Sequence, residues 1–192
     1  MANLDPDIAL VRRVRIGEAS AYAEIVERHK DRAMTLAVRI LKDSLDAEEA
    51  LQDAFVRAFR ALDRFDERAR FSTWFYRILY NVCITRATKR TRQERAMPTT
   101  PLGALEFDPA DNNSPHTILD LHDSAQHVRD AIAELPQLVA TVVTLFYVQE
   151  MSHEEIAEIT GMPIGTIKTY LHRGRKQLAV LLRASGITRE YA

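Results

Sequence analysis

Apolar residues recur along the chain at spacings of three and four, the period of a helix that buries one face. One such stripe lies in residues 20–41 and consists of Tyr22, Ile25, Val26, His29, Leu36, Ile40 and Leu41. Similar patterns predict helices near residues 6–16, 46–62, 72–89, 124–135, 137–148, 152–160 and 165–176. No stretch alternates with the period of a strand, so the pattern predicts an all-α fold.

A proline-rich segment interrupts the helical pattern between residues 97 and 123, and it holds four of the seven prolines. Proline removes a backbone donor and restricts the residue before it, so no long helix runs through this segment. The pattern predicts small helical domains at residues 1–96 and 124–192, joined by a flexible linker at 97–123. The alternative is a long surface loop of one domain. We expect a tether of this composition to leave the two domains mobile in the isolated protein.

The formal charge of −1 hides an uneven distribution of charged side chains. Residues 1–96 carry 19 basic and 15 acidic side chains, whereas the linker carries five acids and no Lys or Arg. No apolar run reaches the roughly 18 residues of a membrane span, and the N-terminus lacks the features of a signal peptide. The single cysteine, Cys83, excludes an internal disulfide and suits a reducing compartment. These features favour a cytoplasmic protein that is not inserted in a membrane.

Two short helices near the C-terminus have the pattern of a helix-turn-helix. Ser152 and Glu155 form a capping box at the start of the first helix, and Gly161 suits its C-terminal cap. The second helix buries Ile164, Ile167, Leu171 and Leu178. Its opposite face then carries Lys168, Thr169, His172, Arg173 and Lys176. Donors on one exposed helix face suit base edges and phosphates in a major groove, although an ordinary solvated basic face is the alternative.

A second basic stretch follows the aromatic sequence RFSTWFY. Its basic residues are Arg77, Arg86, Lys89, Arg90, Arg92 and Arg95. Aromatic side chains beside a basic groove hold unstacked bases, so Trp74 belongs either to such a surface or to the core. The helix at 46–62 carries Glu48, Glu49, Gln52, Asp53 and Val56 away from its core face. This acidic face is either solvated surface or a docking site for a protein.

The segment DAEEALQDAFVRAFRALDRFDERARFSTWFYRILYNVCITRATKR resembles the second conserved region of bacterial RNA polymerase sigma factors. The segment LPQLVATVVTLFYVQEMSHEEIAEITGMPIGTIKTYLHRGRKQL resembles their fourth region. With only the linker between these two blocks, the chain is similar to the extracytoplasmic-function (ECF) group of the sigma-70 family. The resemblance implies a region 2 helical bundle and a region 4 helix-turn-helix.

The resemblance also implies partners and roles for particular residues. Glu49, Gln52, Asp53 and Val56 would dock on the clamp helices of the polymerase beta-prime subunit. The loop from Asp66 to Arg70, with Arg68 at its centre, would accept a flipped base of the minus-10 promoter element. The melted strand would run along Phe71, Trp74 and Asn81. Its backbone would be held by Arg77, Arg86, Lys89 and Arg90.

The C-terminal helix, through Lys168, Thr169, His172, Arg173 and Lys176, would read the minus-35 element. The linker would pass through the polymerase active-site cleft and RNA exit path, where its carboxylates mimic RNA charge. The resemblance therefore implies core RNA polymerase, including its beta and beta-prime subunits, and promoter DNA as partners. It further implies an anti-sigma factor, which in many relatives is a membrane protein.

The alternatives to this interpretation are an enzyme and a different helix-turn-helix regulator. The sequence contains no Gly-rich phosphate loop, HExxH or paired-Cys metal motif, so it predicts neither an enzyme nor a cofactor. A metal site at His116, His122 and His127 would lack further ligands at the usual spacing. A different helix-turn-helix regulator would use its N-terminal helices to sense a ligand, and it would need an apolar pocket there.

Overall fold

The computed structural model describes residues 5–96 and 120–184, and these residues form helices without any strand. The all-α prediction is therefore confirmed for the described part of the chain. The predicted path of the linker through the polymerase lies outside the described residues, as do His116 and its surroundings.

Four helices and a short 3₁₀ turn form the N-terminal half. They are α1 (Pro6–Arg15), α2 (Ala19–Leu41), α3 (Ser44–Ala61), the turn Leu62–Arg64 and α4 (Phe71–Ala96). Helix α2 lies at the centre of the molecule, and its buried stripe includes Ile25, Leu36 and Ile40 as predicted. Cys83 on α4 is also buried, and burial raises the pKa of its thiol to about 12.

Two helix boundaries in this half differ from the prediction. Helix α3 begins at Ser44 because the Asp43 carboxylate caps it, accepting a hydrogen bond from the Asp46 amide at 2.9 Å. The helical pattern predicted a start near residue 46, but Asp43, three residues before Asp46, is the N-cap. Helix α4 continues to Ala96, beyond the last apolar position of its stripe, so its basic end is helical.

The C-terminal half also has four helices. They are α5 (Asp120–Ala133), α6 (Gln137–Val143) with its π-helical extension Thr144–Val148, α7 (His153–Thr160) and α8 (Ile164–Ala184). The capping box of Ser152 and Glu155 is confirmed, and Gly161 ends α7 in the left-handed conformation with φ 71°. Helix α5 begins at Asp120, within the segment that the prolines had led us to predict as linker.

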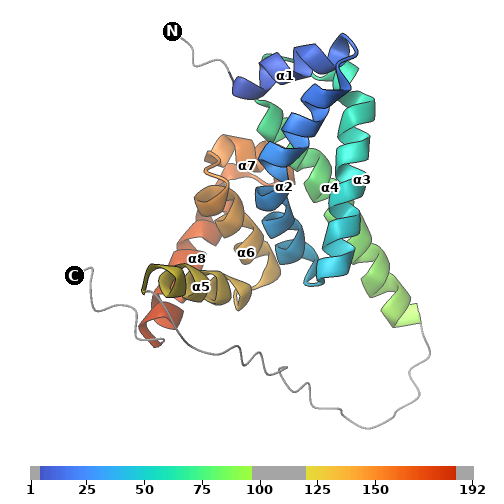
Figure 1. The fold of residues 1–192 in the computed structure, drawn as a ribbon. Coiled ribbons are helices and arrows are strands. Elements are labelled where there is room, and N and C mark those ends of the chain that lie inside the picture. Colours follow the sequence, from blue (N-terminus) through green and yellow to red (C-terminus); the bar gives the residue numbers. More distant parts are fainter. Residues whose placement is uncertain (1–4, 97–119, 185–192) are drawn as a thin grey trace.

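The two halves pack against each other, with α7 beside α4 and α6 beside α2 (Figure 1). The buried side chain of Gln149, only 7% exposed, joins them. It accepts a hydrogen bond from the Tyr76 hydroxyl at 2.6 Å and donates one to the Arg32 carbonyl at 2.8 Å. Gln137 donates to the Ile40 carbonyl at 2.5 Å. The prediction of two small helical domains is confirmed, and in this structure buried polar contacts hold the two domains together.

Candidate nucleic-acid interface

Helix α8 presents one face to solvent and buries the other against α6 and α7. Ile167 and Leu171 are buried, as the helical spacing predicted, and Leu178 is partly buried, but Ile164 is exposed, so its predicted burial is wrong. Gly174 lies so close to α6 that a Cβ atom there would be 2.5 Å from Cγ2 of Val143. The close approach fixes the orientation of the helix on α6. Sequence reasoning did not assign this role to Gly174.

The opposite face of α8 is open. Its exposed side chains are the predicted ones, Lys168, Thr169, His172, Arg173 and Lys176. Thr169 donates a hydrogen bond to the Gly165 carbonyl at 2.9 Å. No ion pair joins Lys168, Arg173 or Lys176 to any side chain in the described ranges. This row of donors is available to a DNA groove without breaking an existing contact.

The loop between α3 and α4 exposes charged side chains at its tip. Asp66 accepts hydrogen bonds from the amide of Arg68 at 3.0 Å and from its guanidinium at 2.6 Å. These hydrogen bonds lower the pKa of Asp66 to about 2. Arg70, at the end of the loop, is also exposed. The tip therefore offers both a fixed acceptor and cationic donors.

Aromatic rings lie beneath this loop. Trp74 is half-buried, with its ring centre 5.1 Å from that of Phe65 and 5.7 Å from that of Phe71. Phe71 is 0% exposed and packs on Phe75, so it supports Trp74 from inside the core and does not line a strand-facing surface. The prediction for Phe71 is corrected accordingly. Its spacing of four from Phe75 was a signal for a shared buried face.

The basic residues of α4 fall into two groups. Arg77 and Lys89 are exposed along the helix, as is the neutral Asn81. Arg86 instead pairs with Asp46 at 3.2 Å and with Glu49 at 3.0 Å. Arg90 donates to the Leu41 carbonyl at 3.0 Å. Two of the predicted backbone-binding arginines are therefore already engaged by α2 and α3.

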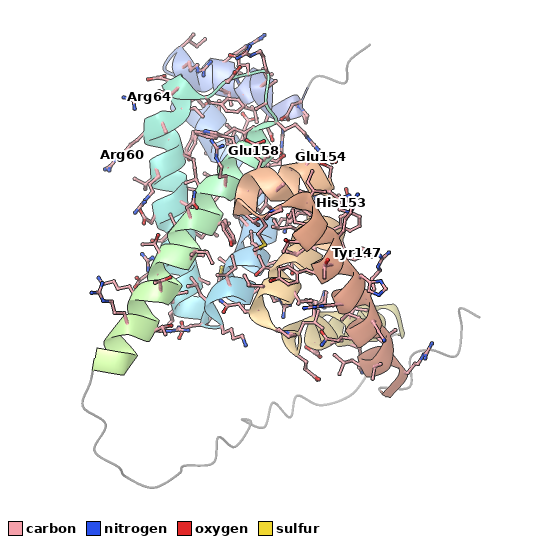
Figure 2. All side chains as sticks on the ribbon, turned by 180° about the vertical axis from the view of Figure 1, so that it is seen from behind. Arg60, Arg64, Tyr147, His153, Glu154 and Glu158 are labelled. Atoms are coloured by element: carbon pink, nitrogen blue, oxygen red, sulfur yellow. The ribbon has the colours of Figure 1, made fainter. Side chains whose placement is uncertain are left out.

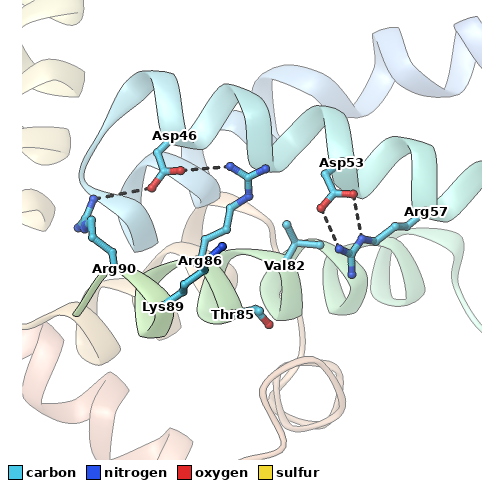
Figure 3. A pocket seen from close by; sticks show the side chains of 8 residues that line it. All are labelled: Asp46, Asp53, Arg57, Val82, Thr85, Arg86, Lys89 and Arg90. Atoms are coloured by element: carbon cyan, nitrogen blue, oxygen red, sulfur yellow. Dashed lines mark hydrogen bonds and ion pairs between the residues drawn. The ribbon is translucent and has the colours of Figure 1, made fainter. Parts of the chain in front are cut away.

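A cavity of about 520 Å³ lies between α3 and α4, and Arg86, Lys89 and Arg90 are among the side chains that line it (Figure 3). Asp53 and Arg57, both on α3, form a two-point ion pair beside it with 2.9 Å contacts. Because charged residues dominate the lining, the cavity is not the apolar pocket that a ligand-sensing regulator would need.

Helix α7 covers part of the α4 surface that the resemblance assigns to the minus-10 strand. Glu155 accepts hydrogen bonds from the Thr73 hydroxyl at 2.9 Å and from Arg70 at 3.2 Å. Glu158 pairs with Arg77 at 3.3 Å, and Figure 2 shows it where α7 meets α4. Burial raises the pKa of Glu155, but the hydrogen bonds from Ser152 and Thr73 and the charge of Arg70 outweigh burial, so its pKa is lowered.

An exposed stripe on α3 combines polar and apolar side chains. Glu49, Gln52 and Val56 are exposed, as predicted from the helical pattern. Leu45 and Phe59 extend this stripe and are also exposed. Apolar side chains grouped on a surface mark contacts with other proteins. Sequence reasoning missed Leu45 and Phe59, although their spacing of four and three from Glu49 and Val56 places them on the same face.

The part of the chain that the structure describes contains no cluster of three potential metal ligands among its His, Cys, Asp and Glu side chains. His127 is exposed on α5. Within these same ranges, every helix is too short or too polar to cross a bilayer.

Comparisons with known proteins agree with both halves. The Sigma-70 region 2 family matches residues 25–93, and the Sigma-70 region 4 family matches residues 125–178. The ECF RNA polymerase sigma factor SigW of Bacillus subtilis is 35% identical over 177 residues, covering 90% of this chain and 95% of that protein. The RNA polymerase sigma-H factor of Pseudomonas aeruginosa is 31% identical over 191 residues, covering 95% of this chain and 99% of that protein.

Solved structures share the arrangement of helices. The sigma factor RpoE of Bartonella quintana, in complex with the anti-sigma factor NepR, matches with a TM-score of 0.65 and 25% identity. That match covers 84% of this chain and 96% of the other. CnrH, in complex with the cytosolic domain of CnrY, also gives a TM-score of 0.65, at 23% identity over 94% of this chain and 99% of that one.

These matches define a class of transcription factor with two conserved regions. The chain belongs to the sigma-70 family of RNA polymerase sigma factors, within the ECF group.

Proposed function

We propose that this chain binds core RNA polymerase in the cytoplasm, directs it to specific promoters and itself performs no catalysis. The observation that carries this proposal is the open donor row on α8, held in place by a buried face and by the close contact at Gly174. A helix of a helix-turn-helix enters the major groove and reads base edges through such side chains. Lys168, Thr169, His172, Arg173 and Lys176 read the minus-35 element.

The N-terminal half recognises the minus-10 element. Asp66, Arg68 and Arg70 form the pocket for a flipped base, and half-buried Trp74 offers a ring for stacking. The backbone of the melted strand is held along α4. Asn81 lines the strand, and the residues that hold its backbone are Arg77, Arg86, Lys89 and Arg90, of which Arg86 and Arg90 must first release their contacts with α3 and α2. Support comes from the exposure of the loop tip and from the aromatic rings that fix Trp74.

The exposed stripe of α3 binds the clamp helices of the beta-prime subunit through Glu49, Gln52, Asp53 and Val56. This assignment is supported by the combination of carboxylate, amide and apolar groups on one face of α3, with Phe59 and Leu45 beside them. Because Asp53 is paired with Arg57, its carboxylate contributes to binding of the beta-prime subunit as part of that ion pair.

Binding of the minus-10 strand to α4 requires α7 to separate from α4. Arg70 and Arg77 cannot hold phosphates while Glu155 and Glu158 occupy them, since each guanidinium would face a carboxylate and a phosphate together. The packed arrangement is therefore a closed form, and promoter opening uses an open one. A soluble or membrane-bound anti-sigma factor that binds across both halves would stabilise the closed form, and the similar sigma factor RpoE of Bartonella quintana forms a complex with the anti-sigma factor NepR.

The test is transcription in vitro by core RNA polymerase with and without this chain, on a library of promoters with randomised minus-35 and minus-10 elements. We expect transcription only when the chain is present, from a small set of promoters that share both elements. Transcripts that start equally without the chain, or that share no sequence upstream, would contradict the proposal.

A further inference from the structure

Helix α1 lies outside the matched range of region 2, which begins at residue 25, and neither the resemblance nor the comparisons assign it a role. It packs across α2 and contacts the 3₁₀ turn that leads into the loop of residues 66–70. This loop is the proposed pocket for the flipped base. The contacts between α1 and the segments that flank the loop are therefore of functional interest.

Arg15 of α1 holds the entrance of the loop. Its guanidinium donates to the Leu62 carbonyl at 2.9 Å and to the Phe65 carbonyl at 2.6 Å. A third carbonyl, that of Asp63, lies 3.4 Å away. Carbonyl groups at the end of a helix lack intrahelical partners, and a cation there satisfies them and interacts favourably with the helix dipole. The planar fork of arginine can reach several of these carbonyls together.

Glu67, inside the loop, is held by the same helix. Its carboxylate pairs with Arg12 and Arg15, each at 2.7 Å. The side chains of Arg15 and Glu67 are only 25% and 27% exposed, so this pair is better shielded than a typical surface ion pair. Glu67 therefore points inward to α1, whereas its neighbours Asp66 and Arg68 remain exposed.

Asp5, the cap of α1, holds the exit of the loop. One carboxylate oxygen accepts from the Asp7 amide at 3.0 Å, and the other accepts from the Phe71 amide at 2.8 Å. The Phe71 amide is the first of α4 and has no partner within that helix. Asp5 thus ties the start of α1 to the start of α4.

From these contacts we infer that α1 positions the minus-10 pocket, with Arg15, Arg12 and Asp5 as positioning residues. They fix both flanks of the loop and the inward side chain of Glu67, so that Asp66, Arg68 and Arg70 present one arrangement to the base. A site that is prearranged in this way loses selectivity when its support is loosened. The inference rests on the proposed role of the loop in minus-10 recognition.

The experiment uses holoenzyme and promoters that differ only at the base taken by the loop. Arg15→Ala should lower the ratio of transcription between the best and worst base by about fivefold or more, since one well-placed contact contributes roughly 1–3 kcal/mol of discrimination. Glu67→Gln, which weakens the same ion pairs with little change in shape, should lower the ratio in the same direction. Preferences at the minus-35 element should stay as in the wild type.

Two control variants separate positioning from other effects. Arg64→Ala removes a guanidinium from the adjacent turn, where the side chain is exposed and forms no ion pair with the described residues, so the ratio should not change. Tyr22→Phe removes a hydrogen bond to the Phe55 carbonyl elsewhere in the same half, and it tests whether a loss of stability alone alters the ratio.

Asp66→Ala shows whether the loop reads the base at all. If Asp66→Ala removes the preference while Arg15→Ala and Glu67→Gln leave it intact, the positioning role of α1 is wrong and the proposed pocket stands. If Asp66→Ala leaves the preference unchanged, both are wrong. A uniform loss on every promoter for Arg15→Ala, matched by Tyr22→Phe, would also overturn the inference, because it indicates general destabilisation.

Discussion

The two surfaces that we propose to face DNA differ in whether their basic residues are already paired. On α8, Lys168, Arg173 and Lys176 form no ion pairs within the described residues, and the helix needs no rearrangement to meet a groove. Arg70 of the loop and Arg77 of α4 already contact Glu155 and Glu158 of α7. The proposed minus-35 surface is therefore accessible in the closed form, whereas the proposed minus-10 surface must first be uncovered.

The contrast indicates where control can act. Helix α7 belongs to the same helix-turn-helix as α8, so one small domain presents its DNA-reading face while its other side covers the neighbouring domain. A partner that holds α7 against α4 would block strand binding without touching α8. Each prediction below alters one of the two surfaces and leaves the other unchanged.

The largest effect is expected at the open surface. Arg173→Ala should lower transcription from the cognate promoter by roughly 5- to 150-fold, since a guanidinium matched to guanine contributes about 1–3 kcal/mol. The loss should be confined to one minus-35 base pair, as measured on single-base variants at two salt concentrations. Lys176→Ala should instead weaken all variants alike and flatten the salt dependence by about one unit of slope.

The matched control is Arg183→Ala, which removes an exposed arginine from the last turn of α8 and should change little. If Arg173→Ala lowers every minus-35 variant by the same factor, Arg173 contacts backbone and the base-reading assignment is wrong.

The next effect concerns the support of the open surface. Gly174→Ala should lower the free energy of unfolding by about 1–3 kcal/mol, because the new Cβ overlaps Val143 in a packed interface. Gly165→Ala is the matched control, since nothing lies within 4 Å of its Cβ position. Thermal unfolding of both variants measures the difference. Equal midpoints would show that α8 does not depend on this close contact.

At the covered surface, Gln149→Ala should favour the open form. In the closed form this substitution leaves the Tyr76 hydroxyl and the Arg32 carbonyl without their hydrogen-bond partner, which destabilises that form by about 1–3 kcal/mol. In the open form, water satisfies both groups. The affinity of the isolated protein for a labelled single strand carrying the minus-10 element should rise by about fivefold or more. Tyr22→Phe should not raise it, and a lowered affinity for Gln149→Ala would contradict the closed form.

The smallest effect is expected from acid. The Ser152 cap within α7 lowers the pKa of Glu155 in either form, and the Thr73 hydrogen bond and the Arg70 charge lower it further in the closed form only. Those two contacts are therefore fully present above the unfolded value of 4.5 and are lost as the pH falls through the folded value. We expect acid to favour the open form by a few-fold at most, because partly exposed ion pairs contribute about 1 kcal/mol or less. Glu155→Gln should remove this part of the pH dependence of strand binding. An unchanged pH dependence would exclude Glu155 as its source.

Local signals in the sequence predicted most elements and the exposed row of Lys168, Thr169, His172, Arg173 and Lys176 on α8, although the helix continues to Ala184. The capping box at Ser152 and the glycine at position 161 defined α7, and helical spacing separated Ile167 and Leu171 from the DNA-facing row. Such features depend on residues within a few positions of each other, and a single sequence contains that information.

The contacts between the halves could not be predicted in this way. Tyr76 and Gln149 are 73 residues apart, and neither belongs to a periodic pattern that names its partner. The same holds for Arg15, which reaches carbonyls 47 to 50 residues away. A polar side chain can be satisfied by water or by a distant group, and the sequence does not distinguish the two. The proline-rich composition of the linker therefore gave no signal for the contacts between the halves.

Energy transfer between fluorophores tests most directly whether the closed form and the minus-10 strand compete for α4. Cysteines in place of Arg60 on α3 and Arg183 on α8 would carry the labels, since both positions are exposed and the buried Cys83 thiol should not react. We predict one constant transfer efficiency in the isolated protein and a change in transfer as the minus-10 strand is added, with a midpoint equal to that of strand binding. Transfer that stays unchanged while the strand binds would show that α7 and the strand do not share the α4 surface, and it would contradict the account.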